Sequence, residues 1–294
     1  MELEQREFDL IRDMVYGAAG LRFEDHKRSF VQTRVGRRMA AIGCTTAREY
    51  YRHLRFHDPD GEELQKLIES LTTNETYFFR EYPQLQCFAN EALPEVVERK
   101  RALGRRLKIW SAACSTGDES YTLAIILQAC LEGVSEWQVE ILATDIDLQA
   151  LARAQRGVYS ARAVKDVPGP YLKKYFRLRS GMYHVVPEVK RMVTFAQVNL
   201  LDRHAMRCQT DYDFIFCRNV LIYFDDAARR KVLGCFYDSL LPGGFIFLGH
   251  SESVGRISAA FEMVSLGGYI TCRRPLDGRR PGRVVRGGAL CLSE

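Results

Sequence analysis

The chain has 294 residues, and 42 Lys and Arg against 37 Asp and Glu give a formal net charge of +5. Hydrophobic residues make up 47% and charged residues 27%, which is ordinary for globular proteins and excludes a wholly disordered, collagen-like or coiled-coil chain. No apolar run reaches the length of a membrane span. The nine cysteines include no CxxC pair, so the sequence indicates neither a zinc site nor a disulfide framework and fits a reducing, cytoplasmic setting.

Helical periodicity dominates the first 72 residues. Helices are expected over about 3–15, 25–41, 46–54 and 62–71. Gly17 and Gly20 are expected to interrupt the chain after the first helix, and residues 58–61 predict a turn before the last. Because no strand pattern appears here, residues 1–72 are predicted to form a small all-helical domain, followed by a linker and connecting helix over 73–106.

The pattern changes at about residue 107. Short apolar runs that end in small or polar residues alternate with helical stretches as far as residue 274, which predicts an α/β fold, a parallel sheet with helices on both faces. Two runs separated by Gly267-Gly268 predict an antiparallel hairpin at the sheet edge. Residues 176–197 interrupt the alternation as a small hairpin-bearing insertion, and residues 275–294 are expected to be a disordered basic tail.

The loop after the first expected strand combines small residues with one glycine and two acids, Ser115-Thr116-Gly117-Asp118-Glu119. Small residues let a ligand approach the backbone at the carboxyl end of a sheet. A dinucleotide site would need GxGxxG there, and acids at a helix start repel pyrophosphate. The loop therefore favours a ligand that is cationic or that offers hydroxyl or amino donors. The alternative is a tight strand–helix turn with a capping acid.

Asp145 ends the second expected strand, 28 positions after Gly117. An acid in this place can accept hydrogen bonds from ribose hydroxyls, although it can also be a strand-end cap. The two signals together suggest a nucleoside ligand without pyrophosphate, and hence S-adenosylmethionine (SAM).

Two further segments supply polar groups. Residues 217–219 follow a later strand, where the Asn/Asp-Pro-Pro-aromatic tetrad of many amino-group methyltransferases is absent. Cys217 is expected to be a core residue rather than a nucleophile. The segment that precedes the sheet carries Asn74, Thr76 and Arg80; taken alone, it is an interdomain linker with a helix cap.

Six ordered segments together resemble the CheR family, the SAM-dependent chemotaxis receptor glutamate O-methyltransferases. These segments are 71–81, 111–120, 143–147, 198–201, 217–225 and 248–253. The resemblance covers nearly the whole chain. It implies a Rossmann-like class I SAM methyltransferase domain over 107–274, with an antiparallel edge hairpin and a small antiparallel β-subdomain at 176–197, and an all-helical N-terminal domain that docks the substrate.

The resemblance also implies roles for individual residues. Cofactor contacts are expected from Asn74, Thr76, Arg80, Gly117, Glu119, Asp145, Asn199, Leu200, Arg218 and Asn219. Glu119 would meet the amino-acid end of the cofactor, Asp145 its ribose and Asn199-Leu200 its adenine; no metal is expected. The family loop often reads Ser-Thr-Gly-Glu-Glu-Pro-Tyr-Ser, whereas this chain has Asp118 and lacks the proline. This departure leaves open which acid contacts the cofactor.

Arg80 and Tyr223 are expected, by the same resemblance, to border the site of methyl transfer. A glutamate side chain has a pKa of about 4.3 and is already a carboxylate at pH 7, so transfer needs in-line placement rather than a general base. Arg80 could hold the substrate carboxylate through its guanidinium. Tyr223 could donate a hydrogen bond to the non-attacking oxygen or line the sulfonium, or it could close the pocket without a chemical role.

The second expected helix carries a basic face. Lys27, Arg34, Arg37 and Arg38 share one narrow arc, and residues 26–48 contain no acid. A solvated helix face would explain this arc, but an acidic partner helix would also fit it, and the resemblance implies receptor helices rich in glutamate. A nucleic-acid partner is less expected, because no aromatic residues are interleaved for base stacking.

The function implied is transfer of a methyl group from SAM to glutamate carboxylates in the cytoplasmic domains of chemotaxis receptors, by a cytoplasmic monomer without membrane insertion. Whether the insertion also binds a receptor C-terminal peptide by strand addition stays open. The alternatives are a non-catalytic scaffold that binds SAM or a receptor and, less favoured, a nucleic-acid methyltransferase. The charge is unevenly distributed: residues 26–48 carry six basic side chains and no acid, while the body of the chain is acidic. This distribution fits a glutamate-rich partner that docks on the second helix.

Overall fold

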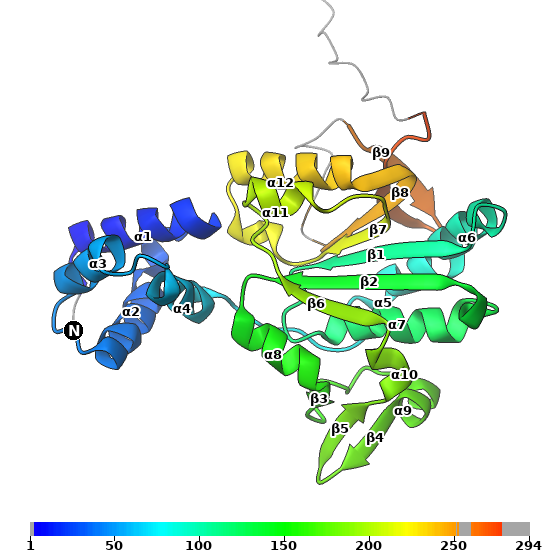
Figure 1. Cartoon of the computed structure of the whole chain (residues 1–294), viewed down its shortest axis with the longest axis horizontal. Coiled ribbons are helices and arrows are strands. Elements are labelled where there is room, and N and C mark those ends of the chain that lie inside the picture. Colours follow the sequence, from blue (N-terminus) through cyan, green and yellow to red (C-terminus); the bar gives the residue numbers. More distant parts are fainter. Residues whose placement is uncertain (1–2, 251, 253–259, 278–294) are drawn as a thin grey trace, which may run out of the picture.

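The computed structural model describes residues 3–250, 252 and 260–277. Figure 1 shows a helical domain joined by an extended segment to a sheet domain, from which a second, smaller sheet projects. Most of the tail expected at 275–294 lies outside the described residues. Within the described ranges, no helix combines the length and the apolar character that a membrane span requires.

The N-terminal domain is helical, as predicted. Its helices are α1 Gln5–Ala19, α2 Arg28–Ile42, α3 Ala47–Phe56 and α4 Glu62–Leu71, with a single 3₁₀ turn, Asp25–Lys27, before α2. The expected break at Gly17 is wrong, because α1 continues through that residue and ends at Gly20, whose φ of 69° provides a left-handed cap. One glycine inside a helix costs only about 1 kcal/mol, which the buried face of α1 can offset.

The main sheet has the order β6-β2-β1-β7-β8-β10-β9. Its strands are β1 Arg106–Ala112, β2 Gln138–Asp145, β6 Val193–Gln197, β7 Tyr212–Cys217, β8 Leu240–Leu248, β9 Glu262–Leu266 and β10 Tyr269–Arg273. The five strands from β6 to β8 are parallel, and β10 runs antiparallel to both β8 and β9. The parallel sheet and its antiparallel edge hairpin are thereby confirmed.

Helices cover both faces of this sheet (Figure 1). One face carries α5 Tyr82–Cys87, the π-helical turn Phe88–Ala92, α6 Leu93–Arg101, α7 Asp118–Cys130 and α8 Leu148–Arg156; the other carries α11 Arg203–Arg207 and α12 Asp226–Ser239. Neighbouring strand residues divide between the two cores, since Ile109 faces α7 while Trp110 packs against α12. The core on the α12 side continues into the helical domain.

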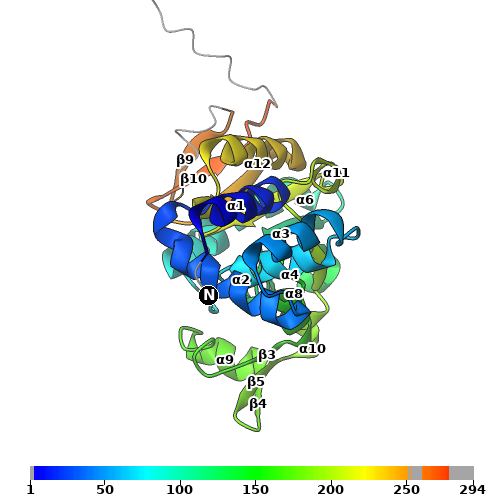
Figure 2. The ribbon, with the colours of Figure 1, turned by 90° about the vertical axis from the view of Figure 1, so that its left-hand side faces the viewer.

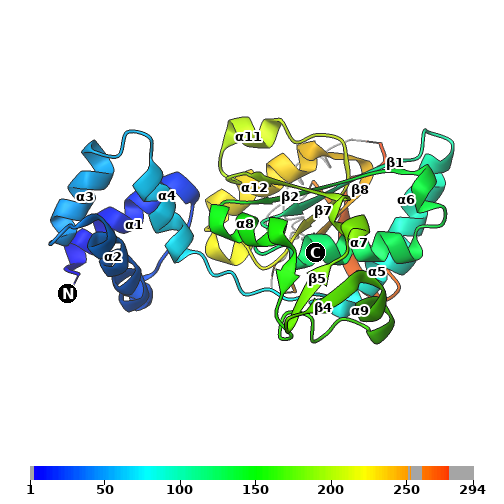
Figure 3. The same ribbon diagram turned by 60° about the horizontal axis from the view of Figure 1, so that its bottom comes forward.

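The second sheet is antiparallel, with the order β3-β5-β4. It consists of β3 Val158–Tyr159, β4 Phe176–Arg179 and β5 Met182–Val185. Helix α9 Gly169–Tyr175 lies beside it (Figure 3), as does α10 Pro187–Lys190 (Figure 1). The expected bounds, 176–197, are therefore corrected. The β-subdomain begins at Val158, because a two-residue strand leaves no alternation to detect, and Val193–Gln197 instead pairs with β2 in the main sheet.

Candidate functional site

A cleft lies where the loops after β1, β2, β6 and β7 meet the linker and the helical domain; we call it the strand-end cleft. Its volume, including the part open to solvent, is about 1070 Å³. Parallel strands place their carboxyl ends on one edge of a sheet, which brings distant segments together here. Apart from Gly117, the residues predicted to contact the cofactor all line this cleft, as does Tyr223: Asn74, Thr76, Arg80, Glu119, Asp145, Asn199, Leu200, Arg218 and Asn219.

Gly117 has a packing role instead. It caps the N-terminus of α7 with a φ of 88°. A Cβ at this position would lie 2.8 Å from the Cβ of Ala154 and 3.1 Å from the hydroxyl of Tyr159. Only glycine accepts both the left-handed backbone and this close approach. Gly117 thus lets α7 begin against α8, and its place among the cofactor contacts stays a prediction.

The two acids at the start of α7 point to different places. Glu119 lines the cleft, and its carboxylate accepts hydrogen bonds from Ser111 Oγ at 2.7 Å and Arg218 Nη1 at 3.3 Å. Asp118 is 1% exposed, accepts from Thr116 Oγ1 at 2.7 Å and does not line the cleft. Burial raises the pKa of Glu119, an effect that Arg218 partly offsets. The sequence does not decide which of these two acids contacts the cofactor. In the structure, Glu119 faces the cleft and Asp118 does not.

Asp118 should make the stability of the fold depend on pH. Burial raises the pKa of this carboxyl from 3.8 to about 6, so the folded state favours the neutral form. Ionisation of Asp118 therefore lowers the free energy of unfolding; this loss is absent below pH 4 and grows as pH rises through about 6. We expect Asp118→Asn to gain about 1.5 kcal/mol of unfolding free energy, relative to wild type, between pH 5 and pH 7.5. Urea unfolding at both pH values measures this difference.

Asp13→Asn is the control for this measurement, because that carboxyl is exposed beside Arg12. Its stability difference from wild type should stay near zero between the two pH values. A gain for Asp118→Asn that is the same at pH 5 and pH 7.5 would show that the amide improves packing and that Asp118 is ionised at no extra cost.

Asp145, at the end of β2, accepts backbone N–H groups on both carboxylate oxygens. Ser115 donates at 2.7 Å and Asp147 at 2.9 Å. Burial raises the pKa of Asp145, and these two donors act in the opposite direction. A carboxylate offers about four lone-pair sites, so two remain for donors inside the cleft. Asp145 can therefore cap the strand end and accept hydrogen bonds from a ligand at the same time.

Arg218 is a buried guanidinium between two acids. Its side chain is 4% exposed, with Nη1 3.3 Å from Glu119 and Nη2 3.4 Å from Glu81. Nη2 also donates to the carbonyl of Arg80 at 2.5 Å. A buried charge of this kind is tolerated only when it is paired. Arg218 thereby joins the loop after β7 to the segment that carries Arg80. Glu81, within the family-like segment 71–81, takes part in this contact, although the sequence alone indicated no role for it.

Asn74, in the linker, connects two strand-end loops. Its Nδ2 donates to Asp147 at 2.6 Å, and its Oδ1 accepts from Ser115 Oγ at 3.1 Å. Thr76 lies further along the same wall of the cleft. The linker therefore forms part of the site, because Asn74 hydrogen-bonds both of the loops that carry Asp145 and Glu119.

Arg80 lies between two residues with left-handed backbones, Phe79 at φ 59° and Glu81 at φ 55°. Bulky residues rarely adopt this conformation. Here Phe79 is buried, and its N–H donates to Thr122 Oγ1 at 3.2 Å. Arg80 Nη1 donates to the carbonyl of Glu75 at 2.9 Å. The packing therefore holds a strained turn that directs Arg80 into the cleft, as is common at functional sites.

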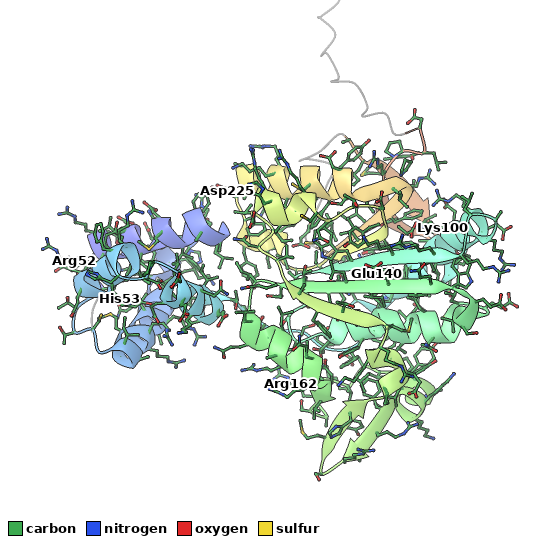
Figure 4. The ribbon with its side chains drawn as sticks, in the orientation of Figure 1. Arg52, His53, Lys100, Glu140, Arg162 and Asp225 are labelled. Atoms are coloured by element: carbon green, nitrogen blue, oxygen red, sulfur yellow. The ribbon has the colours of Figure 1, made fainter. Side chains whose placement is uncertain are left out.

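The helical domain supplies part of the cleft wall, through Ala19 at the end of α1. Asn199 Nδ2 donates to the carbonyl of Ala18 at 2.6 Å, and the Tyr16 hydroxyl donates to Asp225 at 2.6 Å. Asp225 lies at the end of α12 that faces α1 (Figures 2 and 4). Asn199 thus holds the two domains together as well as lining the cleft, a role that the sequence did not indicate.

A second cleft, which we call the interdomain cleft, lies between the start of α2 and the start of α12. Its volume, including open space, is about 1460 Å³. It shares four residues with the strand-end cleft: Leu71, Thr73, Tyr223 and Phe224. Its lining also includes the half-exposed Ile222 and charges of both signs: Arg22, Lys27, Arg229, Glu24, Asp225 and Asp226. The two clefts therefore meet at Tyr223.

The basic face predicted on the second helix is only partly free. Lys27 borders the interdomain cleft, and Arg37 is exposed. Arg34 stacks over Phe30, with 5.0 Å between its guanidinium carbon and the ring centroid. Arg38 instead bonds the buried carboxylate of Glu63 through Nε at 2.9 Å and Nη2 at 2.5 Å. Arg38 therefore has a partner on another helix, which helical periodicity cannot detect, and its docking role stays a prediction.

Cys217 is a core residue, as expected. It is fully buried at the end of β7, and burial raises the pKa of its thiol well above the ordinary value. A thiol that stays protonated is a poor nucleophile. Among the described residues, no three His, Cys, Asp or Glu side chains are grouped to hold a metal ion.

Comparison with known protein families assigns almost the whole chain. The description "CheR methyltransferase, all-alpha domain" matches residues 6–72, and "CheR methyltransferase, SAM binding domain" matches residues 74–270. The first match coincides with α1 to α4. The second contains most of the residues that line the strand-end cleft and the whole β-subdomain.

Curated relatives match over most of their length. Chemotaxis protein methyltransferase 2 of Vibrio cholerae is 42% identical, over 87% of this chain and 88% of that protein. Chemotaxis protein methyltransferase 2 of Pseudomonas aeruginosa is 37% identical over 85% and 87% of the two chains. The chemotaxis protein methyltransferase of Escherichia coli is 34% identical over 90% of each. The chain belongs to the CheR methyltransferase family.

Proposed function

We propose that this protein transfers a methyl group from SAM to glutamate carboxylates of chemotaxis receptors, forming glutamate methyl esters and S-adenosylhomocysteine for sensory adaptation. Family membership and the relatives' names support this activity. The observation that carries the proposal is that Tyr223 lines both clefts. A carboxylate that enters through the interdomain cleft would therefore meet a cofactor held in the strand-end cleft.

The donors and acceptors of the strand-end cleft suit a nucleoside with an amino-acid tail. Asp145 keeps lone pairs for the ribose hydroxyls, and Glu119 offers a carboxylate to the ammonium group of the tail. The apolar Val198 and Leu200 line the cleft beside Asn199 and offer a surface for the adenine ring. Bound SAM would supply the methyl group as an electrophilic carbon on a sulfonium.

Arg80 and Tyr223 have orienting roles in this proposal. A glutamate carboxylate is already ionised at pH 7, so the protein has no proton to remove. Arg80 uses one N–H for the carbonyl of Glu75 and retains other donors with which to hold the incoming carboxylate. The hydroxyl of Tyr223 would donate to the non-attacking oxygen, which leaves the other oxygen free to attack in line.

The docking of receptors is assigned to the helical domain. Lys27 lies in the 3₁₀ turn before α2 and borders the interdomain cleft, and Arg34 and Arg37 lie on α2, whereas Arg38 is paired with Glu63. Acidic receptor helices are the partner that this charge favours. The edge strand β4 of the β-subdomain, with Leu178 62% exposed, is the proposed place for a receptor C-terminal peptide.

Label transfer from methyl-labelled SAM to receptor cytoplasmic domains tests the proposal. Receptor sites that carry Glu should accept label that base releases as methanol, and sites that carry Gln should not. Equal label on both would contradict the carboxylate mechanism. Base-stable label on nucleic acid would favour the nucleic-acid methyltransferase, and SAM binding without transfer to any receptor would favour the non-catalytic scaffold.

A further inference from the structure

Glu252 follows β8, in the last of the six family-like segments, to which the proposed function gives no role. Its carboxylate accepts hydrogen bonds from four backbone N–H groups. Oε2 accepts from Gly249 at 2.7 Å and Asn219 at 2.9 Å. Oε1 accepts from Val220 at 2.8 Å and Ile222 at 3.3 Å. Three of these donors belong to the loop that follows β7, so one side chain holds three backbone groups of that loop.

Gly249, three residues before Glu252, has no space for a side chain. The N–H of Glu252 donates to the carbonyl of Gly249 at 2.9 Å, which closes the turn. A Cβ at position 249 would lie 2.7 Å from Glu252 Oε2 and 2.8 Å from the backbone nitrogen of Asn219. The glycine is therefore required by space, because a methyl group would separate the carboxylate from the loop that it holds.

The loop held in this way carries three residues of the site. Arg218 and Asn219 line the strand-end cleft, and the 3₁₀ turn Leu221–Tyr223 brings Tyr223 to the junction of the two clefts. Asn219 has a left-handed backbone, with φ at 60°, a conformation that costs energy unless the surroundings fix it. The hydrogen bonds that Glu252 accepts from Asn219, Val220 and Ile222 are fixing contacts of this loop.

We infer that Glu252 is a positioning residue for methyl transfer. It acts through the loop 218–223, setting the place of Tyr223 at the junction and of Arg218 beside Glu119. Glu252 itself does not line either cleft, so it acts on substrate and cofactor only through that loop. The expected effect of Glu252 on methyl transfer rests on the proposed function. Its expected effect on S-adenosylhomocysteine binding rests on the strand-end cleft alone.

Glu252→Gln tests the inference with almost no change of shape. Each carboxylate oxygen faces two N–H donors, so a glutamine must turn its own NH₂ group toward two of them, whichever way it is placed. The loop would then move, and a displacement of about 1 Å at a reacting group can cost about 100-fold in rate. We expect kcat to fall by about 100-fold and the dissociation constant of S-adenosylhomocysteine to rise by about 10-fold.

Asp213→Asn is the matched control. Asp213 lies at the opposite end of β7, where it accepts from the backbone of Lys108 at 2.9 Å and from Lys100 Nζ at 2.6 Å. Both variants replace a carboxylate that accepts from the backbone, four N–H groups for Glu252 and one for Asp213, and both should lower Tm. Only Glu252→Gln should change kcat and the affinity for S-adenosylhomocysteine. Glu252→Asp, which keeps the charge, should recover part of both.

Gly249→Ala is a second route to the same result, because the added methyl separates Glu252 from Asn219 while leaving both side chains intact. Unchanged kcat and unchanged S-adenosylhomocysteine affinity in folded Glu252→Gln would overturn the inference and leave Glu252 a purely structural residue. If the wild-type protein methylates no receptor, the proposed function fails, yet titration of S-adenosylhomocysteine into the variants still decides whether Glu252 positions the binding loop.

Discussion

Replacing Arg80 by alanine should lower the turnover of receptor methylation by about 10²–10³-fold while changing the affinity for S-adenosylhomocysteine by less than about 3-fold. The guanidinium lines the strand-end cleft from a strained turn between Phe79 and Glu81. Its loss removes the donors proposed to hold the substrate carboxylate, which S-adenosylhomocysteine does not need. Single-turnover label transfer and calorimetric titration measure the two quantities.

Arg162→Ala is the control for this comparison. Arg162, labelled in Figure 4, is 86% exposed and pairs with the side chain of Glu75 at 3.6 Å. Arg80 instead bonds the carbonyl of Glu75. Losing an exposed ion pair should cost little, so the control should keep wild-type turnover. Equal proportional losses of turnover and S-adenosylhomocysteine affinity in Arg80→Ala would mean that Arg80 only binds the cofactor.

Asp145→Asn should weaken the binding of both SAM and S-adenosylhomocysteine by about 100-fold. The carboxylate already accepts one backbone N–H on each oxygen, so an amide must turn its NH₂ group toward Ser115 or Asp147. The change also removes the charge that strengthens hydrogen bonds from ribose hydroxyls, each worth about 1.5–3 kcal/mol. Calorimetric titration of both ligands gives the loss directly.

Asp202→Asn provides the matched comparison for Asp145. Asp202 caps α11 and, like Asp145, accepts two backbone N–H groups, those of His204 and Ala205. It does not line the strand-end cleft. Wild-type affinity is expected for Asp202→Asn. A folded Asp145→Asn protein that binds both ligands as the wild type does would leave Asp145 a strand-end cap and nothing more.

Local sequence patterns are sufficient to predict most of the fold. The switch from helical periodicity to alternating strands and helices locates the domain change, and the double glycine at 267–268 identifies the edge hairpin. The bounds of the β-subdomain are not predictable in this way, because Val158–Tyr159 is too short to show a pattern. Gly17 does not break α1 because tertiary packing, which no local rule contains, holds that helix intact.

The site is predictable where the fold itself collects residues. Parallel strand ends meet at one sheet edge, so the order of strands and helices along the chain is enough to group the polar residues after β1, β2 and β7. Contacts between distant elements cannot be predicted in this way. Such contacts include the pairing of Arg38 with Glu63, the packing of Gly117 against Ala154 and the three bonds from the loop after β7 to Glu252.

The two matched family domains meet at residues 72–74, and this boundary runs through the wall of the strand-end cleft. Ala19 from one domain and Asn199 from the other line the same cavity, and the Asn199 side chain donates a hydrogen bond to the carbonyl of Ala18. The helical domain is therefore not an interchangeable adaptor. Grafting one from a relative with a different receptor specificity would also replace part of the ligand cavity, so receptor choice and cofactor affinity are expected to have evolved together.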